Sequence, residues 1–384
     1  MRRLLDIGRL RRITTDGRFI PEIDGFRLLA ILVVINEHVW RQVAGPLGVA
    51  YPAWLELPDS GRRGVFLFFT ISGFILGLPF ARRALLPQPT GTPPFSYRRY
   101  LLRRVTRLEP PYVLSLCGRF ALILLVFHEN GRALLPHFLA SLFYVHNVVF
   151  GAMSRVSPPT WSLEVEVQYY LLAPLFAAVF LVRPASLRRA LLLGIVLALG
   201  VATQGARAAA PRVALSIAGN LQYFTAGLLL CDLYLTQPLR RIPAWMWDLV
   251  AVAALIPLLW SEATWVRELF PLGSVAILLA GMKGRQVRRF FAAPMVSVTG
   301  GMCYSLYLTH GTVLALVAAG LAAAPGHAAP AGVRTLEVIG ASLAATFAAG
   351  GLFYVLIERP CMDPGWPRKA AALLWPRRAG TAPA

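Results

Sequence analysis

The sequence predicts an all-α protein, a polytopic integral membrane helix bundle of about ten transmembrane helices. Of its 384 residues, 57% are hydrophobic and only 15% are charged, and the mean hydropathy is +0.60. A water-soluble domain does not need so apolar a composition. The apolar residues also gather in runs of about 17 to 25 residues, the length at which a helix crosses a bilayer. The expected spans are residues 26–44, 64–80, 109–127, 161–182, 190–206, 216–236, 245–260, 268–282, 300–322 and 335–357.

The Lys and Arg residues indicate which side of the membrane is cytoplasmic. Ten spans place both termini on one side, and 27 of the 38 Lys and Arg residues fall on that side, against nine on the other and two within spans. The positive-inside rule therefore predicts cytoplasmic termini. The same segregation explains the net charge of +20. We expect no nucleic-acid partner, because basic and aromatic residues are not interleaved as they are in single-strand binders.

Three parts follow from this topology: a basic cytoplasmic N-terminal segment at residues 1–20, a transmembrane domain at 21–360 and a basic cytoplasmic tail at 361–384. The first segment lacks a short apolar run with a small-residue cleavage site, so a removable signal peptide is not expected. The four cysteines form no CxxC pair. This spacing predicts neither a disulfide framework nor a metal site.

The first span carries ionisable residues at membrane depth. Arg27 and His38 are eleven helical steps apart, which brings their directions within about 20° of each other around the helix axis. We therefore expect both to face one cavity, with Asn36 and Glu37 directly before the histidine. Because an unpartnered charge at this depth costs about 2.5 kcal/mol or more, the cluster indicates a functional site. The alternative is a structural histidine that is hydrogen-bonded to neighbouring helices.

The second span and the loop after it combine small residues with many arginines. Ser72 and Gly73 favour close packing of membrane helices. Residues 97–109 are expected to form an amphipathic helix that ends at Pro110-Pro111. Arginine suits bidentate phosphate binding, so a phosphate-bearing cytoplasmic ligand is one interpretation, and anchoring to anionic lipid headgroups is the other. The arginines of this segment are Arg98, Arg99, Arg103, Arg104 and Arg107.

The fourth span begins with Trp161 and carries two carboxylates in its first turns. Glu164 and Glu166 lie about 200° apart on a helix, so they cannot both serve one small site, whereas Glu166 and Tyr170 share a face. We interpret Glu164 as a charge favoured by the helix dipole. Glu166, close to Gln168 and Tyr170, is the functional candidate.

Other polar or moderately apolar segments permit simpler interpretations. The run 138–153, in the long outside connection, is expected to be a re-entrant or interfacial segment. The polar residues within 220–223 are read as interhelical hydrogen bonds. In the ninth span Tyr307 and His310 share a face, and this second intramembrane histidine favours a polar cavity. Glu358-Arg359 is read as a structural ion pair at the cytoplasmic interface.

Six motifs, in this order, resemble those of the membrane acyltransferase 3 family and extend over nearly the whole chain. Asp24 to His38 is similar to the family's signature of an arginine, ten residues and a histidine, and Gly64 to Phe74 is similar to its motif Gly-Val-x-x-Phe-Phe-x-x-Ser-Gly-Phe. Arg104-x-x-Arg107 resembles its two spaced arginines, and Trp161 to Tyr170 resembles Trp-Ser-Leu-Ser-Val-Glu-Glu-Gln-Phe-Tyr. Tyr304 to His310 resembles Tyr-Ser-Leu-Tyr-Leu-Trp-His, and Ile357 to Pro360 resembles the closing motif. The chain departs from the family where Val167 replaces a common second glutamate, and where Thr309 and Gly311 replace tryptophans that often flank the histidine.

The resemblance implies a multi-pass O-acyltransferase of the bacterial inner membrane. Members of the family transfer acyl groups to sugars of surface polysaccharides, to lipid-linked glycans and to some secreted small molecules. Acyl-CoA, with acetyl-CoA the expected form, would be the cytoplasmic co-substrate, and a sugar, glycan or glycolipid would offer its hydroxyl group on the periplasmic side. Membrane lipids surround the bundle, and neither a bound cofactor nor a metal is expected.

The resemblance also implies roles for individual residues. His38 would be the general base, with Glu37 or Glu166 as an orienting partner, and Arg27 would bind the thioester carbonyl or a phosphate. His310 joins the expected catalytic group. The expected substrate-binding residues are Arg103, Arg104 and Arg107 near the CoA phosphates, and Ser72, Trp161, Gln168, Tyr170 and Tyr307 within the bundle.

A membrane transporter or flippase of a glycolipid or small metabolite is the alternative, in which the same polar residues line a pathway. Against it, the two halves of the sequence show no inverted repeat and no matched pair of broken helices. A sensory or scaffold protein would leave the histidines and the arginine loop without a purpose. The residues leave both direct transfer and an acyl-histidine intermediate open, and they indicate no oligomeric state.

Overall fold

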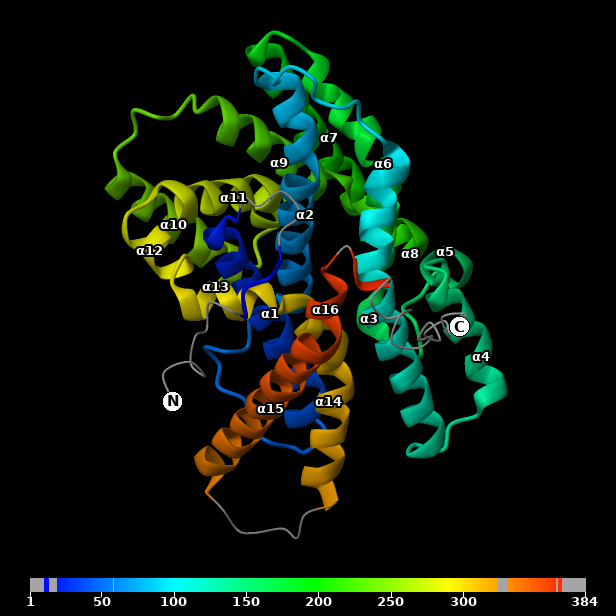
Figure 1. Ribbon diagram of the computed structural model, residues 1–384. Helices are drawn as coiled ribbons and strands as arrows, with labels where there is room; N and C mark the ends of the chain where they lie inside the picture. Colours follow the sequence, from blue (N-terminus) through cyan, green and yellow to red (C-terminus); the bar gives the residue numbers. More distant parts are fainter. Residues whose placement is uncertain (1–9, 14–18, 58, 324–329, 364, 368–384) are drawn as a thin grey trace, which may run out of the picture.

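The structure is a computed structural model that describes residues 10–13, 19–57, 59–323, 330–363 and 365–367. Over these residues the chain forms helices and no β-strand (Figure 1). The long helices are α1 (Pro21–Val39), α2 (Ser60–Leu85), α3 (Tyr97–Leu125), α6 (Trp161–Phe176), α7 (Ala185–Ala209), α9 (Ile217–Thr236), α10 (Ala244–Trp260), α11 (Thr264–Lys283), α14 (Cys303–Ala323) and α15 (Ala331–Phe353). The short ones are α4 (Gly131–Leu142), α5 (His146–Phe150), α8 (Pro211–Ala214), α12 (Gln286–Phe291), α13 (Pro294–Gly301) and α16 (Arg359–Cys361), with π-helical turns at Trp40–Ala44 and Tyr354–Glu358 and 3₁₀ turns at Pro158–Thr160 and Ala177–Leu181.

Each predicted span coincides with one of the long helices. In the described part of the chain, eight of them are long and apolar enough to cross a membrane. Of the other two, α10 is shorter, and α1 carries four charged residues, Glu22, Asp24, Arg27 and Glu37. The all-α, multi-pass membrane fold is therefore confirmed. The count of ten spans and the cytoplasmic position of the termini stay predictions.

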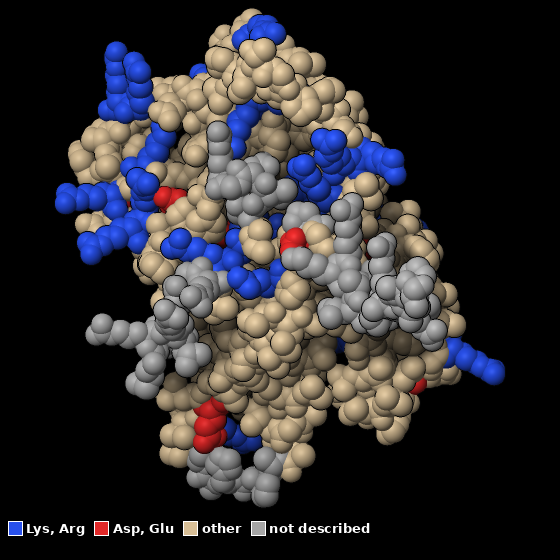
Figure 2. All heavy atoms as spheres, viewed as in Figure 1, with Lys and Arg blue, Asp and Glu red and all other residues tan. Residues whose placement is uncertain are grey.

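Basic side chains are unevenly spread over the surface. In Figure 2 the Lys and Arg residues gather in the upper half of the view, where the loop between α2 and α3 lies. The described part of the lower half, around α14, α15 and α4, is mostly uncharged. This is the kind of segregation on which the positive-inside rule depends.

Helix α2 runs through the middle of the bundle, and glycines allow α9 to approach it closely (Figure 1). A Cβ atom on Gly73 would lie 2.3 Å from the carbonyl oxygen of Phe224, and one on Gly227 would lie 2.4 Å from that of Thr70. A side chain does not fit in either place. The packing role predicted for Gly73 is thus confirmed, and it follows the rule that small residues bring membrane helices together.

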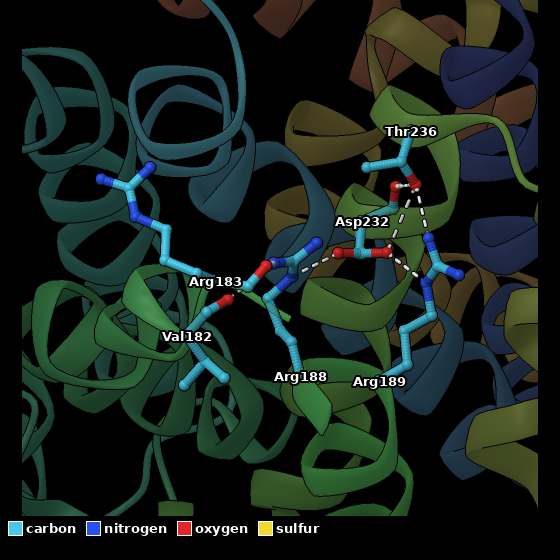
Figure 3. A network of polar contacts seen from close by, with 6 residues as sticks. All are labelled: Val182, Arg183, Arg188, Arg189, Asp232 and Thr236. Carbon is cyan, nitrogen blue, oxygen red and sulfur yellow. Dashed lines mark hydrogen bonds and ion pairs between the residues drawn. The ribbon is translucent and has the colours of Figure 1, made fainter. Parts of the chain in front are cut away.

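A buried carboxylate joins α7 to α9 at one end of the bundle (Figure 3). Asp232 is fully buried, and its two oxygens accept from Arg188 Nε at 2.5 Å and from Arg189 Nε at 2.7 Å. Arg188 also donates to the carbonyl of Val182, and Arg189 to the hydroxyl of Thr236 at 2.9 Å. Because the charges are paired and hydrogen-bonded, this network tolerates burial and fixes the relative position of the two helices.

The expected helix end at Pro110-Pro111 is wrong, because α3 continues through both prolines to Leu125. A proline removes the N–H that would bond the carbonyl four residues earlier. Here the freed carbonyl of Thr106 accepts from Trp366 Nε1 at 2.8 Å, which supplies the donor missing at Pro110. Membrane helices tolerate proline where neighbouring groups satisfy the backbone in this way. The arginine segment and the third span are therefore one continuous helix.

Parts of both chain ends pack on the bundle. The carbonyl of Leu10 accepts from the Tyr354 hydroxyl at 2.9 Å, and Arg12 reaches the buried Asp24. Trp366 lies against α3 through the bond described above. Of the predicted N-terminal segment 1–20 and the tail 361–384, the structure describes residues 10–13, 19–20, 361–363 and 365–367.

The apolar run 138–153 forms the end of α4, the short helix α5 and the loop after it. A histidine pair joins these two helices. His146 is fully buried and donates from Nδ1 to the carbonyl of Ala152 at 3.0 Å, so its Nε2 is the acceptor for His137 Nδ1 at 2.8 Å. Burial lowers the pKa of both imidazoles, and Arg155 adds to this at His137.

Candidate active site

A cavity of about 130 Å³ lies between α1, α2, α3, α6 and α14. We call it the arginine cavity, because four arginines line it together with two carboxylates and several hydroxyl groups. Its polar lining residues are Arg12, Arg27, Ser72, Arg104, Arg107, Ser162, Glu166, Tyr170, Tyr304, Tyr307 and Glu358. Seven of the predicted site residues, contributed by five helices, are thus brought to one place: Arg27, Ser72, Arg104, Arg107, Glu166, Tyr170 and Tyr307.

Helix α1 holds one arginine of the cavity through a buried ion pair. Asp24 is fully buried and accepts from Arg27 Nη1 at 2.7 Å, three residues further along the helix. Its carboxylate also accepts from Arg12 Nε at 2.6 Å, so one acid holds two guanidinium groups. The pairing makes burial of the three charges tolerable, and it leaves each arginine with further N–H donors.

The other two arginines come from α3, one helical turn apart. Arg104 lies over the rings of Tyr100 and Tyr170, at 5.8 and 6.0 Å from their centroids. Arg107 has a buried Nε that finds no hydrogen-bond partner among the described residues. A donor left in this condition inside a cavity is suited to a ligand that supplies an acceptor oxygen.

The carboxylates of the cavity are anchored by serine residues. Glu166 accepts from the Ser72 hydroxyl at 2.7 Å, which joins α6 to α2. Glu358 is buried and accepts from both the backbone N–H and the hydroxyl of Ser305, at 3.0 and 2.5 Å. Glu358 is therefore part of the cavity wall, deeper than the interfacial position read from the sequence.

His38 lies beside the cavity and against the second intramembrane histidine. Its Nδ1 donates to the carbonyl of Val34 at 2.8 Å, which leaves Nε2 of the neutral ring with a free lone pair. The ring meets that of His310 edge to face. His310 in turn donates from Nδ1 to the carbonyl of Tyr307 at 2.7 Å, and its buried Nε2 has no hydrogen-bond partner among the residues described. Both rings are thus set in the same tautomer by their own helices.

Tyr307 connects the histidine pair to the arginine cavity. Its ring centroid is 6.0 Å from that of His310, its hydroxyl donates to the carbonyl of Pro159, and the Ser162 hydroxyl lies 3.1 Å away. Tyr307 and Ser162 both line the cavity. His38 itself is absent from that lining, so the expectation that Arg27 and His38 both face this cavity is wrong.

Four predicted site residues lie elsewhere. Glu37 accepts from the backbone N–H of Gly61 at the start of α2 and pairs with Arg41 at 2.8 Å, so the carbonyl of Val34, not Glu37, orients His38. Gln168 accepts from the backbone N–H of Ile217 at 2.8 Å. Trp161 packs edge to face on Phe69 and lines a different cavity, and Arg103 is exposed outside the arginine cavity.

Some cavity residues were missed in the sequence. Arg12 stands outside any helical period, so no pattern assigned it a position. Tyr304 and Ser162 lie within motifs already noted and were passed over because their chemistry is modest. Arg119 lies outside the cavity lining, where it donates to the Thr312 hydroxyl at 3.2 Å and to the carbonyl of Val156. It had a visible signal, since it is an arginine within a predicted span.

Comparison with known proteins gives a consistent picture. The chain is 32% identical over 185 residues to the peptidoglycan O-acetyltransferase OatA of Listeria monocytogenes, covering 45% of this chain and 26% of that protein. It is 28% identical over 176 residues to YrhL of Bacillus subtilis, provisionally named a peptidoglycan O-acetyltransferase, covering 43% of this chain and 25% of the relative. A protein of Staphylococcus aureus provisionally named an O-acetyltransferase is 24% identical over 332 residues, which cover 78% of this chain and 51% of the relative.

The chain therefore spans between a quarter and about half of the length of these relatives. No solved structure matches significantly. The family described as "Acyltransferase domain" matches residues 20–357, which is most of the sequence. The chain accordingly belongs to this family, the acyltransferase 3 family whose motifs it resembles.

Proposed function

We propose that this protein is an O-acyltransferase of the bacterial inner membrane. It moves an acyl group, with acetyl as the expected group, from cytoplasmic acyl-CoA to a hydroxyl group of a sugar or glycan on the periplasmic side. The observation that carries the proposal is the arginine cavity, linked through Tyr307 to a histidine pair in which His38 keeps a free lone pair. Family membership and the O-acetyltransferase names of the relatives support an O-acyl transfer.

In this proposal Arg104 and Arg107 bind the phosphates of acyl-CoA. Arginine binds phosphate through parallel charge-assisted hydrogen bonds, and a phosphate oxygen would satisfy the unpartnered Nε of Arg107. The pantetheine then extends along the cavity toward Ser162 and Tyr307. Asp24 takes one N–H of Arg27 and leaves others for the thioester carbonyl or a phosphate.

The reaction needs one base and no redox partner. His38 Nε2 takes the proton of the acceptor hydroxyl as its oxygen attacks the thioester carbonyl carbon. The C–S bond breaks, an ester forms, and CoA leaves as a thiolate that recovers the proton from His38. General-base catalysis of this kind contributes typically 10²- to 10⁴-fold.

The test is release of free thiol from acetyl-CoA by purified protein in detergent. We expect His38→Ala to lower the rate by about 10² or more at unchanged folding, because the base is removed. Arg104→Ala should instead raise the acetyl-CoA concentration needed for half-maximal rate. Arg241→Ala and His128→Ala are matched controls, since both side chains are exposed and outside the cavity, and they should leave both quantities unchanged.

A wild-type protein without turnover on acetyl-CoA or longer acyl-CoAs, even with sugars supplied, would overturn the proposal and favour the transporter alternative. A transporter has no reason to release thiol. Equal rates in wild type and His38→Ala would remove His38 from the role of base while leaving the cavity as a donor site.

A further inference from the structure

A second and larger cavity, of about 390 Å³, lies between α2, α7, α9 and α11. We call it the outer cavity, because Arg62, Arg63 and Arg267 line it and all three belong to the side predicted to face the periplasm. Arg63 is built into its wall: the buried guanidinium donates to three backbone carbonyls at the end of α10 and just after it, at 2.6 to 3.0 Å.

A buried amide in this wall has an unused acceptor. Gln222 lines the outer cavity with its side chain 2% exposed. Its Nε2 donates to the carbonyl of Gly219 at 3.2 Å and to the Thr203 hydroxyl at 3.3 Å. Its Oε1 accepts from no group among the described residues. A buried acceptor without a donor calls for a ligand that carries O–H or N–H groups.

Aromatic residues form the side of the outer cavity nearest the arginine cavity. Phe66 stacks on Tyr223 with ring centroids 4.1 Å apart, and Trp161 lines the same cavity. Flat rings next to convergent polar groups are the composition of a site for a small ligand with both apolar faces and hydroxyl groups, which describes a sugar.

The outer cavity and the arginine cavity share two helices, α2 and α6. Trp161 lines the outer cavity and Ser162, the next residue, lines the arginine cavity; on α2, Phe66 and Val65 divide in the same way. Neighbouring residues of α2 and α6 therefore line the two cavities.

We propose that the outer cavity binds the sugar of the acceptor, one hydroxyl of which donates to Gln222 Oε1. This inference rests on the proposed function and gives it a second substrate site, on the opposite side of the membrane from the arginines of α3. It assigns substrate recognition to α7, α9 and α11, helices in which the sequence showed little chemistry.

The test measures the use of the acceptor and the use of the donor separately. Thiol release from acetyl-CoA is measured with and without a panel of probes, namely methyl glucoside, N-acetylglucosamine and chitotetraose. For a probe that stimulates wild type, Gln222→Leu should raise its KM about 5- to 20-fold, the effect of losing one neutral hydrogen bond. Donor KM and acceptor-free hydrolysis should not change.

Gln222→Glu keeps an acceptor oxygen and should restore the KM of the probe to within about threefold. Gln286→Leu, an exposed site on α12, is the control.

Each result decides one point. An unchanged probe KM in Gln222→Leu, with stimulation intact, would overturn the inference and leave the proposed function standing. His38-dependent hydrolysis that no probe stimulates would also overturn it, because the outer cavity would then not recognise these sugars. Loss of acceptor-free hydrolysis in Gln222→Leu that Gln222→Glu does not restore would show a structural role and reject the assignment.

Discussion

The imidazole rings of His38 and His310 meet edge to face, with their centroids 4.8 Å apart and their planes at 82°. They come from α1 and α14, at opposite ends of the sequence. Each ring gives its Nδ1 proton to a carbonyl of its own helix, so the two Nε2 atoms are both unprotonated in the neutral state. His310 is fully buried whereas His38 is partly exposed, which makes His38 the ring that a substrate can reach.

This relationship predicts a positioning role for His310. His310→Phe keeps a ring against His38 but removes both nitrogens. We expect kcat for thiol release to fall about tenfold, because the phenyl ring lacks the hydrogen bond to the Tyr307 carbonyl that holds the imidazole against His38. His38 keeps its own lone pair. Donor KM should stay within twofold. An effect as large as that of His38→Ala would instead mean that His310 takes part in proton transfer, and an unchanged kcat would exclude any role.

The close contact of α2 and α9 predicts a strong effect of one methyl group. Gly73→Ala would place a Cβ 2.3 Å from the Phe224 carbonyl oxygen, so the helices must separate, at a cost of about 1–3 kcal/mol. Gly194→Ala on α7 is the matched control, since its Cβ meets nothing within 4 Å. Thermal unfolding in detergent should show a lower Tm for the first variant, and an equal or higher Tm for the second. Equal Tm values for Gly73→Ala and wild type would contradict the contact.

The network around Asp232 predicts a stability loss that depends on burial. Asp232→Asn leaves Arg188 and Arg189 as neighbouring cations without their anion, and we expect unfolding to become easier by about 3–5 kcal/mol. Asp59→Asn is the control, because the Asp59–Arg62 pair is exposed and 3.6 Å apart. Such pairs contribute less than about 1 kcal/mol. Denaturation of both variants side by side measures the difference, and similar losses in the two would refute the burial argument.

The His137–His146 pair predicts that stability falls in acid. Burial lowers the pKa of both rings in the folded state, and each is near 6.5 when unfolded. Groups with a depressed pKa stabilise the fold above the unfolded value and lose that contribution as the pH falls through the folded value. The hydrogen bond also needs the lone pair of His146 Nε2. The Tm should therefore drop between pH 7.5 and pH 5.

Two variants test whether the pair is the cause. His137→Phe keeps the ring contact with Phe150 and should flatten the pH dependence of Tm. His128→Phe, at an exposed position, should leave it as steep as in wild type. If His137→Phe loses Tm in acid as steeply as wild type does, the effect comes from other groups.

The sequence predicted the helices well because bilayer-length apolar runs are a strong signal. Helical periodicity also predicted correctly that Glu166 and Tyr170, at i and i+4, lie on one face, and both line the arginine cavity. Periodicity within one helix does not predict which hydrogen-bonding groups a neighbouring helix places beside it. Glu37 is one of the two expected orienting partners of His38, yet its carboxylate accepts from a backbone N–H at the start of α2 instead.

Contacts between distant segments account for the remaining differences. At the proline pair of α3, the free carbonyl of Thr106 accepts from Trp366, a residue of the tail some 260 positions away. Arg12 enters the arginine cavity because Asp24 binds it, and the sequence around Arg12 carries no periodic signal. The outer cavity is assembled from four helices whose residues look unremarkable one by one.

Helix α3 has a mechanical consequence. As one uninterrupted rod it carries Arg104 near one end and Arg119, about 22 Å further on, near the other. Arg119 donates to Thr312, two residues after His310. One helix therefore ties the arginines of the cavity to the turn that carries His310, and the length of α3 sets the spacing between the two groups.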